Sequence, residues 1–338
     1  MTDVMVNGAF RGQRVTGQQR YATEIADRLL SLPGIEEAQP SGRWSGTSAR
    51  EWAWTLARLP GLARGSTLVS LTSRAPLGTR QVLAVHDLFV LTHPQWYSRR
   101  YVATHAPALR AQIKAAHAVV AVSEPAAAQI EAHFGVDVVV APNAPSQVFL
   151  DGGHTGDAVL DRIKVAAGNY LLAVGSLDPR KNLARLAAAY GRLTAAERAD
   201  TPLVVVGAGA GIYRSADFDW PDGMIGAGYV SDDELVTLYR ESTAVVFPSL
   251  AEGFGLPLVE AAAAGARALV ISDIPVFRWI CGEGAEYVDP RSEDSILHGL
   301  RAGIEGHSPA IDIDGTRFDW DASAAVVAQA CGHSGGTR

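Results

Sequence analysis

The chain has few of the residues and segments that mark several common classes of protein. Cysteine occurs only twice in 338 residues, at Cys281 and Cys331, and two isolated thiols form neither a disulfide framework nor a zinc site. The nine histidines show no metal-ligand spacing such as HExxH, so no metal ion is expected. No apolar run approaches the roughly 18 residues of a membrane span. The first residues also lack the apolar core of a signal peptide, which predicts a cytoplasmic location.

The rest of the composition, 48% apolar and 19% charged with 34 glycines, is typical of a soluble α/β protein. At 338 residues the chain exceeds the size of a single hydrophobic core, so two domains are expected. Residues 1–150 carry 14 Lys and Arg against 10 Asp and Glu, a balance of +4. Residues 151–338 carry 15 against 26, a balance of −11, and the two sum to the net charge of −7. The first half is predicted to meet an anionic partner or surface, unless the two solvated surfaces merely differ in composition.

Short apolar runs alternate with amphipathic segments in both halves of the chain. The runs are at 4–7, 67–71, 81–85, 118–122 and 136–140, and then at 170–174, 203–206, 244–247 and 268–271. Strands that alternate with helices indicate a doubly wound, mostly parallel sheet in each half. The glycine-containing segment 151–168 is interpreted as the linker. The fold class is therefore α/β, with two Rossmann-like domains expected at 1–150 and 165–317, facing one another across a cleft.

The stretch SLAEGFGLPLVEAAAAG, residues 249–265, follows the apolar run 244–247 and contains two glycines before a run of helix formers. Pro257 near the start and Gly265 at the end are the punctuation of a helix. A glycine loop at a helix N-terminus offers backbone N–H groups and a positive dipole end to an anion. Two carboxylates, Glu252 and Glu260, flank that position. They suggest a ligand that also carries hydroxyl groups, such as a sugar nucleotide.

A second charged loop follows the strand predicted at 170–174. It contains Arg180 and Lys181, and in a parallel sheet it emerges at the same edge as the loop after 244–247. Two cations beside a helix N-terminus could neutralise a diphosphate without a metal. Glu260, about one turn into its helix, could accept hydrogen bonds from two ribose hydroxyls. The alternative for Glu260 is a first-turn acid that stabilises the helix dipole.

Three features of the first half are also candidates for binding. His86 and Asp87 end a predicted buried strand, where open α/β sheets place ligands; alternatively the histidine only caps the strand. Thr16 and Gly17 precede a helix in a loop that a substrate could approach. Residues 41–64 combine tryptophans with arginines, as in helices that lie on anionic membranes. The alternative is that these tryptophans belong to the core.

Two other motifs indicate different chemistry only weakly. VVVGAGAG at 204–211 resembles a dinucleotide fingerprint, but Ile212 stands where the third glycine is required. GHSGG at 332–336 matches the hydrolase pattern GxSxG, yet too few residues follow it for the helix of a nucleophile elbow. No P-loop motif occurs. We therefore expect no cofactor.

EGFGLPLVE at 252–260 resembles the E-x7-E motif of retaining glycosyltransferases of family four, which have the GT-B fold. Further segments similar to that family follow in its order along nearly the whole chain: TGQQRYATEI at 16–25, AVHDL at 84–88, AVSEPAA at 121–127, APNA at 141–144, GSLDPRKNL at 175–183, GYVSDDEL at 228–235 and FDW at 318–320. The resemblance also implies that a C-terminal helix at about 318–332 crosses back to the first domain. Ser176 departs from the family, in which an arginine often follows the glycine at this position.

The resemblance implies a role for each matching residue. Lys181 with Arg180 would hold the diphosphate, and Arg180 could replace the charge missing at Ser176. Glu260 would bind the ribose, Val230 would lie near the base, and His86 would reach a hydroxyl of the donor sugar. The loop at Gly17 would border the leaving phosphate. The sugar and the β-phosphate would be bound by Glu252 and the backbone N–H groups of Gly253, Phe254, Gly255 and Leu256.

The implied function is metal-independent transfer of a hexose, with retention, from a nucleoside-diphosphate sugar to a hydroxyl of a glycan, glycolipid or other cell-envelope saccharide. GDP-mannose is the preferred donor, with other GDP-, UDP- or dTDP-sugars as alternatives. The partners would be that donor and a saccharide or lipid-linked saccharide acceptor, with no nucleic acid. Peripheral contact with the inner face of the membrane is a further expectation for the positive first domain. The alternatives are a sugar-nucleotide epimerase of the same fold and a non-catalytic nucleotide-sugar-binding protein.

Overall fold

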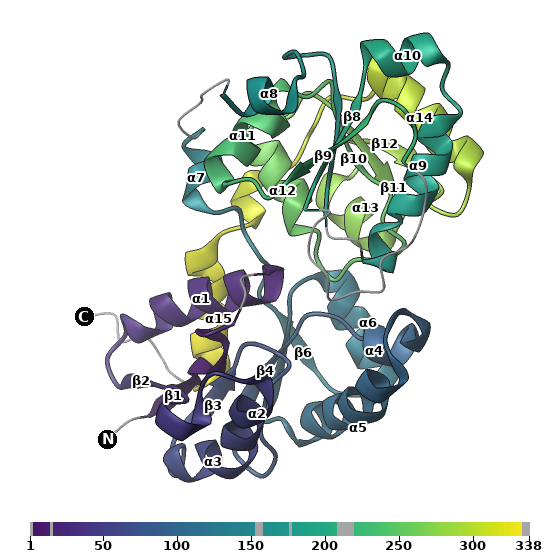
Figure 1. The fold of residues 1–338 in the computed structure, drawn as a ribbon. Helices are drawn as coiled ribbons and strands as arrows, with labels where there is room; N and C mark the ends of the chain where they lie inside the picture. Colours follow the sequence, from purple (N-terminus) through teal and green to yellow (C-terminus); the bar gives the residue numbers. More distant parts are fainter. Residues whose placement is uncertain (1–2, 14–15, 153–157, 176–177, 208–219, 333–338) are drawn as a thin grey trace. The chain divides into compact units, whose positions relative to one another are not determined.

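The computed structural model describes residues 3–13, 16–152, 158–175, 178–207 and 220–332. The contacts between residues divide the chain into two units (Figure 1). The first comprises Met1–Asn143 with Phe318–Arg338, and the second comprises Ala144–Arg317. Residues 144–150, which the sequence suggested for the first domain, thus fall in the second unit. The domain assignment with its binding roles stays a prediction.

The first unit is built on a six-stranded sheet whose strands all pair in parallel. Its strand order is β2-β1-β3-β4-β5-β6, so the direction of winding reverses between β1 and β3. The central strands are buried, whereas the edge strands β2 and β6 are partly exposed. The strands are β1 Val4–Asn7, β2 Ile35–Ala38, β3 Thr67–Ser70, β4 Gln81–Val85, β5 Ala118–Ala121 and β6 Val138–Val140.

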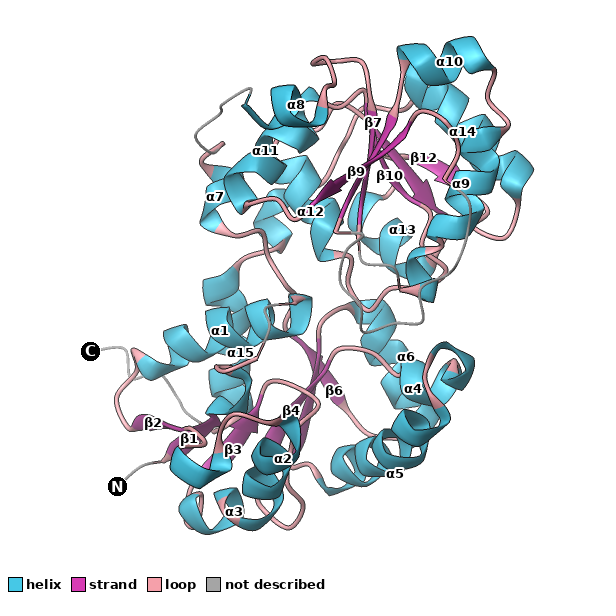
Figure 2. Ribbon diagram, in the orientation of Figure 1, coloured by secondary structure: helices cyan, strands magenta, loops and turns pink. Residues whose placement is uncertain are grey.

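Helices surround this sheet (Figure 2). They are α1 Gly17–Leu30, α2 Ser48–Ala57, α3 Leu59–Leu62, α4 Phe89–Thr92, α5 Arg99–Ala115, α6 Glu124–Phe134 and α15 Trp320–Ala330, with 3-10 turns η1 Gly8–Phe10, η2 Gly42–Trp44 and η3 Pro94–Trp96. Although it comes from the end of the chain, α15 packs against α1. The hydroxyl of Ser323 also donates to the carbonyl of Pro142 at 2.8 Å. The chain therefore ends on the unit in which it begins.

The second unit repeats the architecture, with six parallel strands in the order β12-β11-β10-β7-β8-β9. Its strands are β7 Leu171–Val174, β8 Leu203–Val206, β9 Met224–Gly228, β10 Ala244–Phe247, β11 Leu269–Ser272 and β12 Glu286–Val288. Its helices and 3-10 turns are α7 Gln147–Leu150, α8 Ala158–Ile163, η4 Pro179–Lys181, α9 Leu183–Gly191, α10 Ala195–Asp200, α11 Asp232–Glu241, α12 Leu256–Ala263, α13 Pro275–Cys281, α14 Glu293–Glu305 and η5 Gly315–Arg317. The α/β fold class with two Rossmann-like domains is thus confirmed.

Two interpretations of the sequence are corrected by the fold. The segment 151–168 is not simply a linker, because it contains α8, whose Val159, Leu160 and Ile163 are buried in the second unit. Trp54 is not a membrane anchor, since only 2% of it is exposed and it packs in the core with Leu59 and Leu68. In both segments the apolar side chains are buried in the core of their own unit. No described helix is both long and apolar enough to cross a bilayer.

Candidate active site

The candidate site lies in the second unit, where the winding of the sheet reverses. β8 and β9 lie beyond β7 on one side, and β11 and β12 lie beyond β10 on the other. In open α/β sheets the crevice at the carboxyl ends of two such strands is the preferred ligand site. The loops that leave β7 and β10 at this edge carry Lys181 and Glu252. The fold therefore brings together the two charged loops that the sequence identified.

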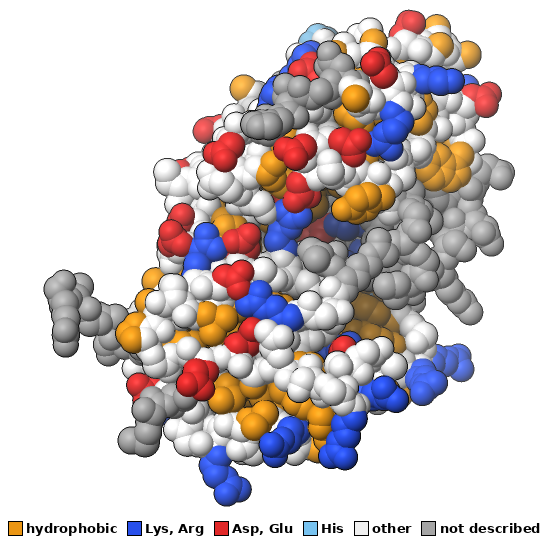
Figure 3. Space-filling model, turned by 60° about the vertical axis from the view of Figure 1, so that its left-hand side comes forward, with side chains coloured by type: hydrophobic (Ala, Val, Ile, Leu, Met, Phe, Trp, Pro, Cys, Tyr) orange, Lys and Arg blue, Asp and Glu red, His pale blue; other side chains and the backbone are white. Residues whose placement is uncertain are grey.

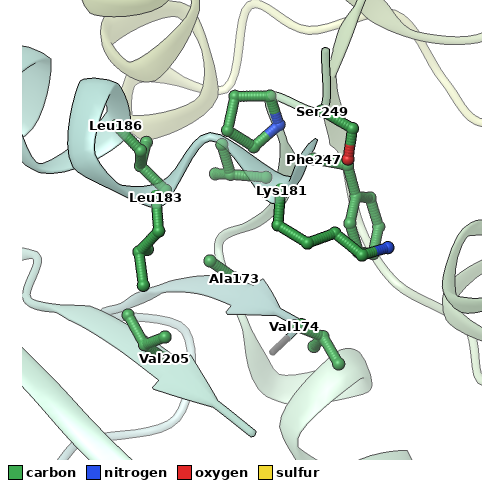
Figure 4. Close-up of a pocket in the computed structure, with 11 residues that line it drawn as sticks. Ala173, Val174, Lys181, Leu183, Leu186, Val205, Phe247 and Ser249 are labelled. Carbon is green, nitrogen blue, oxygen red and sulfur yellow. The ribbon is translucent and has the colours of Figure 1, made fainter. Parts of the chain in front are cut away.

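A small cavity forms the floor of this crevice (Figure 4). It holds about 20 Å³, room for roughly one water molecule, and so it is not itself a nucleotide pocket. Figure 4 shows the side chain of Lys181 extending toward Phe247 and Ser249. The other lining residues are mainly apolar: Ala173, Val174, Gly175, Leu183, Leu186, Val205, Val246 and Pro248. The cation thus lies over an apolar floor, where charge–charge interactions are weakly screened.

Lys181 forms an ion pair with Glu252. Its Nζ donates to Oε1 of Glu252 at 2.7 Å, and the two side chains are only 18% and 8% exposed. The hydroxyl of Ser249 donates to the same Oε1, also at 2.7 Å. The aliphatic stem of Lys181 lies over Gly175, where an added Cβ would stand 3.2 Å from the lysine Cγ. Gly175 therefore leaves room for Lys181 to reach the carboxylate.

Glu252 remains ionised in this environment. Burial by itself would raise its pKa, but the charges of Lys181 and Arg180 and the hydrogen bonds from Lys181 and Ser249 outweigh burial. The net effect is a pKa below the usual value for a glutamate. The carboxylate can therefore accept hydrogen bonds from ligand hydroxyl groups at neutral pH.

Asn182 joins three loops at the same edge of the sheet. Its Nδ2 donates to the carbonyl of Pro248, after β10, at 3.0 Å and to that of Pro290, after β12, at 2.7 Å. Its backbone is left-handed, with φ of 59°, a conformation that asparagine adopts more readily than most residues. The sequence analysis assigned no function to Asn182. The sequence feature that could have indicated this role is the asparagine directly before a helix in DPRKN.

Arg180 is held within its own turn. Its Nε donates to Oδ2 of Asp178 at 2.8 Å, and Asp178 also accepts from the backbone N–H of Arg180 through Oδ1 at 2.9 Å. The carbonyl of Arg180 accepts from the N–H of Leu250 at 2.7 Å, which ties the two charged loops together. Arg180 thus adds positive charge close to Glu252. Ser176, whose missing charge Arg180 was predicted to replace, lies outside the described residues.

The glycine loop precedes α12 as the sequence predicts. Gly255 has φ of +96°, and a Cβ there would lie 2.9 Å from Cε1 of Phe277, so only glycine fits. Phe254 is 4% exposed and packs edge-on against Trp279, with ring centroids 6.1 Å apart. Gly253 is half-buried and Leu256 is buried. Packing thus fixes the loop that delivers the first N–H groups of α12, and anion binding there stays a prediction.

Two of the predicted nucleotide contacts are more buried than expected. Glu260 lies about one turn into α12 and is 6% exposed, so little of it is accessible to a ribose. Val230 is 8% exposed and its side chain belongs to the core, which leaves its backbone for a base. The preceding Tyr229 is 86% exposed. The roles of Glu260 and Val230 stay predictions.

The predicted residues of the first unit lie at the carboxyl edge of its own sheet. His86 follows β4 and is 9% exposed, and its Nε2 donates to the carbonyl of Leu71 at 2.9 Å. Burial lowers the pKa of His86 despite the opposing effects of Leu71 and Asp87, so the ring is neutral with Nδ1 as its acceptor. Oδ1 of Asp87 accepts from the N–H of Phe89 at 3.0 Å, which makes Asp87 a turn residue. Gly17 begins α1 and has open space beside it.

Among the described residues no three His, Cys, Asp or Glu side chains are arranged to hold a metal ion. The structure thus places Lys181, Arg180 and Glu252 together and brings Gly253, Phe254, Gly255, Leu256 and Glu260 to the same edge through α12. Gly17 and His86 lie in the other unit.

Two family models match the chain. The model described as "Glycosyl transferases group 1" matches residues 162–308, and "Glycosyltransferase Family 4" matches residues 53–144. Each match falls almost entirely within one of the two units. Together with the two sheets, these matches support a glycosyltransferase of the GT-B fold.

Relatives of known description are similar over part of their length. The chain is 28% identical over 239 residues to O-antigen chain mannosyltransferase B of Escherichia coli, covering 64% of this chain and 59% of that protein. It is also 28% identical over 227 residues to the O-antigen chain mannosyltransferase RfbU of Salmonella typhimurium, covering 65% and 60%. The chain thus spans about three fifths of each relative.

Solved structures agree over nearly the whole chain. A sucrose-phosphate synthase from Thermosynechococcus elongatus superposes with a TM-score of 0.70 at 15% identity, covering 97% of this chain and 98% of that one. WaaG, a glycosyltransferase involved in lipopolysaccharide biosynthesis, gives 0.63 at 16% identity, covering 96% and 95%. At these identities the similarity shows the fold alone.

Proposed function

We propose that this chain is a retaining, metal-independent hexosyltransferase that moves mannose from GDP-mannose to a hydroxyl of a cell-envelope saccharide. The observation that carries the proposal is the buried pair of Lys181 and Glu252 at the reversal point of the second sheet, beside the N-terminus of α12. The choice of mannose is supported by the relatives, which are described as O-antigen mannosyltransferases.

In this proposal the cations act on the leaving group. A lysine ammonium has three N–H donors, and one of them is used by Glu252. The other two, together with the positive end of α12, would stabilise the charge that develops on the diphosphate. Arg180 would add to the same field. Glu260 would accept from the ribose hydroxyls.

Glu252 would bind hydroxyls of the transferred sugar, with Oε1 already accepting from Lys181 and Ser249, and the proposal assigns no residue as a nucleophile. Retention then requires attack on the same face that the diphosphate leaves. The bond from C1 to the diphosphate oxygen breaks with its electron pair going to the diphosphate. The acceptor oxygen bonds to C1, and a phosphate oxygen takes the proton of the acceptor hydroxyl. His86, neutral, would accept from a sugar hydroxyl through Nδ1.

Contact of the first unit with an anionic membrane is part of the proposal for the acceptor. Figure 3 shows Lys and Arg side chains gathered along one margin of this unit. Leu56 and Leu62, on α2 and α3, are 54% and 38% exposed, and Arg58 between them is also exposed. A surface of this kind suits anionic headgroups, and a lipid-linked saccharide would lie there.

The substitution Lys181→Ala tests the proposal at its central residue. We expect GDP-mannose affinity to fall at least tenfold and turnover to fall further, since a charge-assisted contact contributes about 1.5–3 kcal/mol. Titration calorimetry and release of GDP would measure the two effects. Lys114→Ala, an exposed lysine of α5, is the matched control. Equal behaviour of the two variants would contradict the assignment of the diphosphate to Lys181.

A further inference from the structure

Ser249 is a buried residue that none of the predicted contacts includes. It lies just after β10, only 1% exposed. Its hydroxyl donates to Oε1 of Glu252 at 2.7 Å, and Nζ of Lys181 reaches the same oxygen at the same distance from a loop 71 residues away. Two strong donors therefore converge on one oxygen of the carboxylate.

The second carboxylate oxygen of Glu252, Oε2, has a different environment. Among the described residues no hydrogen bond to Oε2 is found, and Oε2 is not one of the buried side-chain atoms that lack a partner, so solvent can reach it. An ionised carboxylate can accept about four hydrogen bonds, so Oε2 can accept from water or from a ligand hydroxyl. The arrangement thus leaves one defined oxygen with capacity for a donor from outside the chain.

We propose that Ser249 is a positioning residue that fixes the rotation of the Glu252 carboxylate, so that Oε2 accepts a hydrogen bond from a hydroxyl of the donor sugar. This inference rests on the proposed function. Without the Ser249 hydroxyl, the carboxylate can rotate about its terminal torsion, which is broad and has no strong preference of its own. Lys181 could then contact both oxygens, which would cover Oε2 and draw the ammonium away from the diphosphate.

A purely local reason for the contact is that Ser249 stabilises its own turn, since the two residues are three positions apart. That reason does not explain why the donor meets the oxygen already bound to Lys181 and leaves Oε2 without a donor. The two explanations differ in their consequences. A turn-stabilising serine affects folding, whereas a positioning serine affects sugar recognition and the titration of Glu252.

The test compares Ser249→Ala with the wild type, using GDP and GDP-mannose as ligands. We expect GDP affinity to change less than twofold and GDP-mannose affinity to fall about tenfold, because only the sugar contacts Oε2. The acid limb of kcat/KM should also move to higher pH. Glu252 acts ionised, the hydrogen bond from Ser249 lowers its pKa, and its removal makes the carboxylate protonate sooner as pH falls.

Ser242→Ala is the matched control, because Ser242 is also fully buried in the second unit but donates to the carbonyl of Tyr239. Ser249→Thr, which keeps the hydroxyl, should restore the acid limb; thermal melting of each variant reports on folding. This inference alone would be overturned if the wild type is active and Ser249→Ala has the same GDP-mannose affinity and the same acid limb of kcat/KM as Ser242→Ala. A wild type that binds neither GDP nor GDP-mannose would overturn the proposed function as well.

Discussion

At the scale of single residues, the site depends on side chains that would be costly to bury alone. Lys181 and Glu252 are mostly buried, and each compensates the charge of the other. Removing one partner of such a pair leaves an uncompensated charge. A loss of function in Lys181→Ala must therefore be separated from a loss of stability, and the melting temperature of each variant does this.

Tyr21 is a polar residue that is buried without a hydrogen bond for its hydroxyl among the described residues. It is fully buried in α1, its ring meets His86 edge-on at 5.1 Å, and its hydroxyl has no hydrogen-bond partner among the described residues. An unpaired buried hydroxyl costs about 1–3 kcal/mol. The ring packs against both His86 and Trp320, so the packing at this position depends on the aromatic ring and not on the hydroxyl.

We therefore expect Tyr21→Phe to raise the free energy of unfolding by about 1 kcal/mol. Tyr170→Phe is the matched control, because the Tyr170 hydroxyl donates to the carbonyl of Leu238 at 2.8 Å; its loss should lower stability by a similar amount. Scanning calorimetry measures both. A destabilised Tyr21→Phe would mean that this hydroxyl has a partner such as a bound water.

At the scale of elements, the site is held by loops that leave β7, β10 and β12 at one edge of the sheet. Asn182 lies in the loop after β7, and its side chain donates hydrogen bonds to carbonyls in the loops after β10 and β12. Such loops are the mobile parts of an α/β fold, so a single side chain that joins three of them limits how far Lys181 and Glu252 can separate. The geometry of the ion pair thus depends on Asn182, which follows Lys181 in the chain but whose side chain is not part of the pair.

Asn182→Gly keeps the left-handed backbone but removes the hydrogen bonds to the carbonyls of Pro248 and Pro290, and also the one that Oδ1 accepts from Arg185. We expect GDP-mannose affinity to fall about tenfold, because the two bonds that join the loops, of about 1 kcal/mol each, are lost and the loops gain freedom. Lys164→Gly is the control, since Lys164 has the same φ of 59° in the same unit. Calorimetry that gives equal affinities for these two variants would show that Asn182 does not organise the site.

The sequence predicted the central strands and the glycine loop because a buried strand followed by glycines and a helix is a strong local pattern. It missed β2, β9 and β12, whose segments IEEA, MIGAG and EYV are short, contain charged residues or glycine, and lie at sheet edges. Placing Lys181 and Glu252 at one edge followed from the parallel topology. Their direct contact, and the hydrogen bonds of Ser249 and Asn182, could not be predicted, because they depend on side-chain packing between distant loops.

At the scale of the whole molecule, the site residues predicted from the sequence are divided between the two units. The group 1 model falls within the second unit, which contains Lys181, Glu252 and α12. The family 4 model falls almost wholly within the first, which contains His86. The last helix, α15, returns to the first unit and packs on α1. In the proposed function the second unit would bind the donor, and the positive first half of the chain would meet an anionic acceptor or surface.

The measurement that tests the central claim most directly is transfer itself. Purified protein is incubated with GDP-mannose in the presence of EDTA, with and without a mannose-containing saccharide acceptor, and the products are analysed by NMR. The proposal predicts release of GDP that requires the acceptor, and a new glycosidic bond with the anomeric configuration of the donor. Conversion of the nucleotide sugar without an acceptor, or a product of inverted configuration, would contradict it.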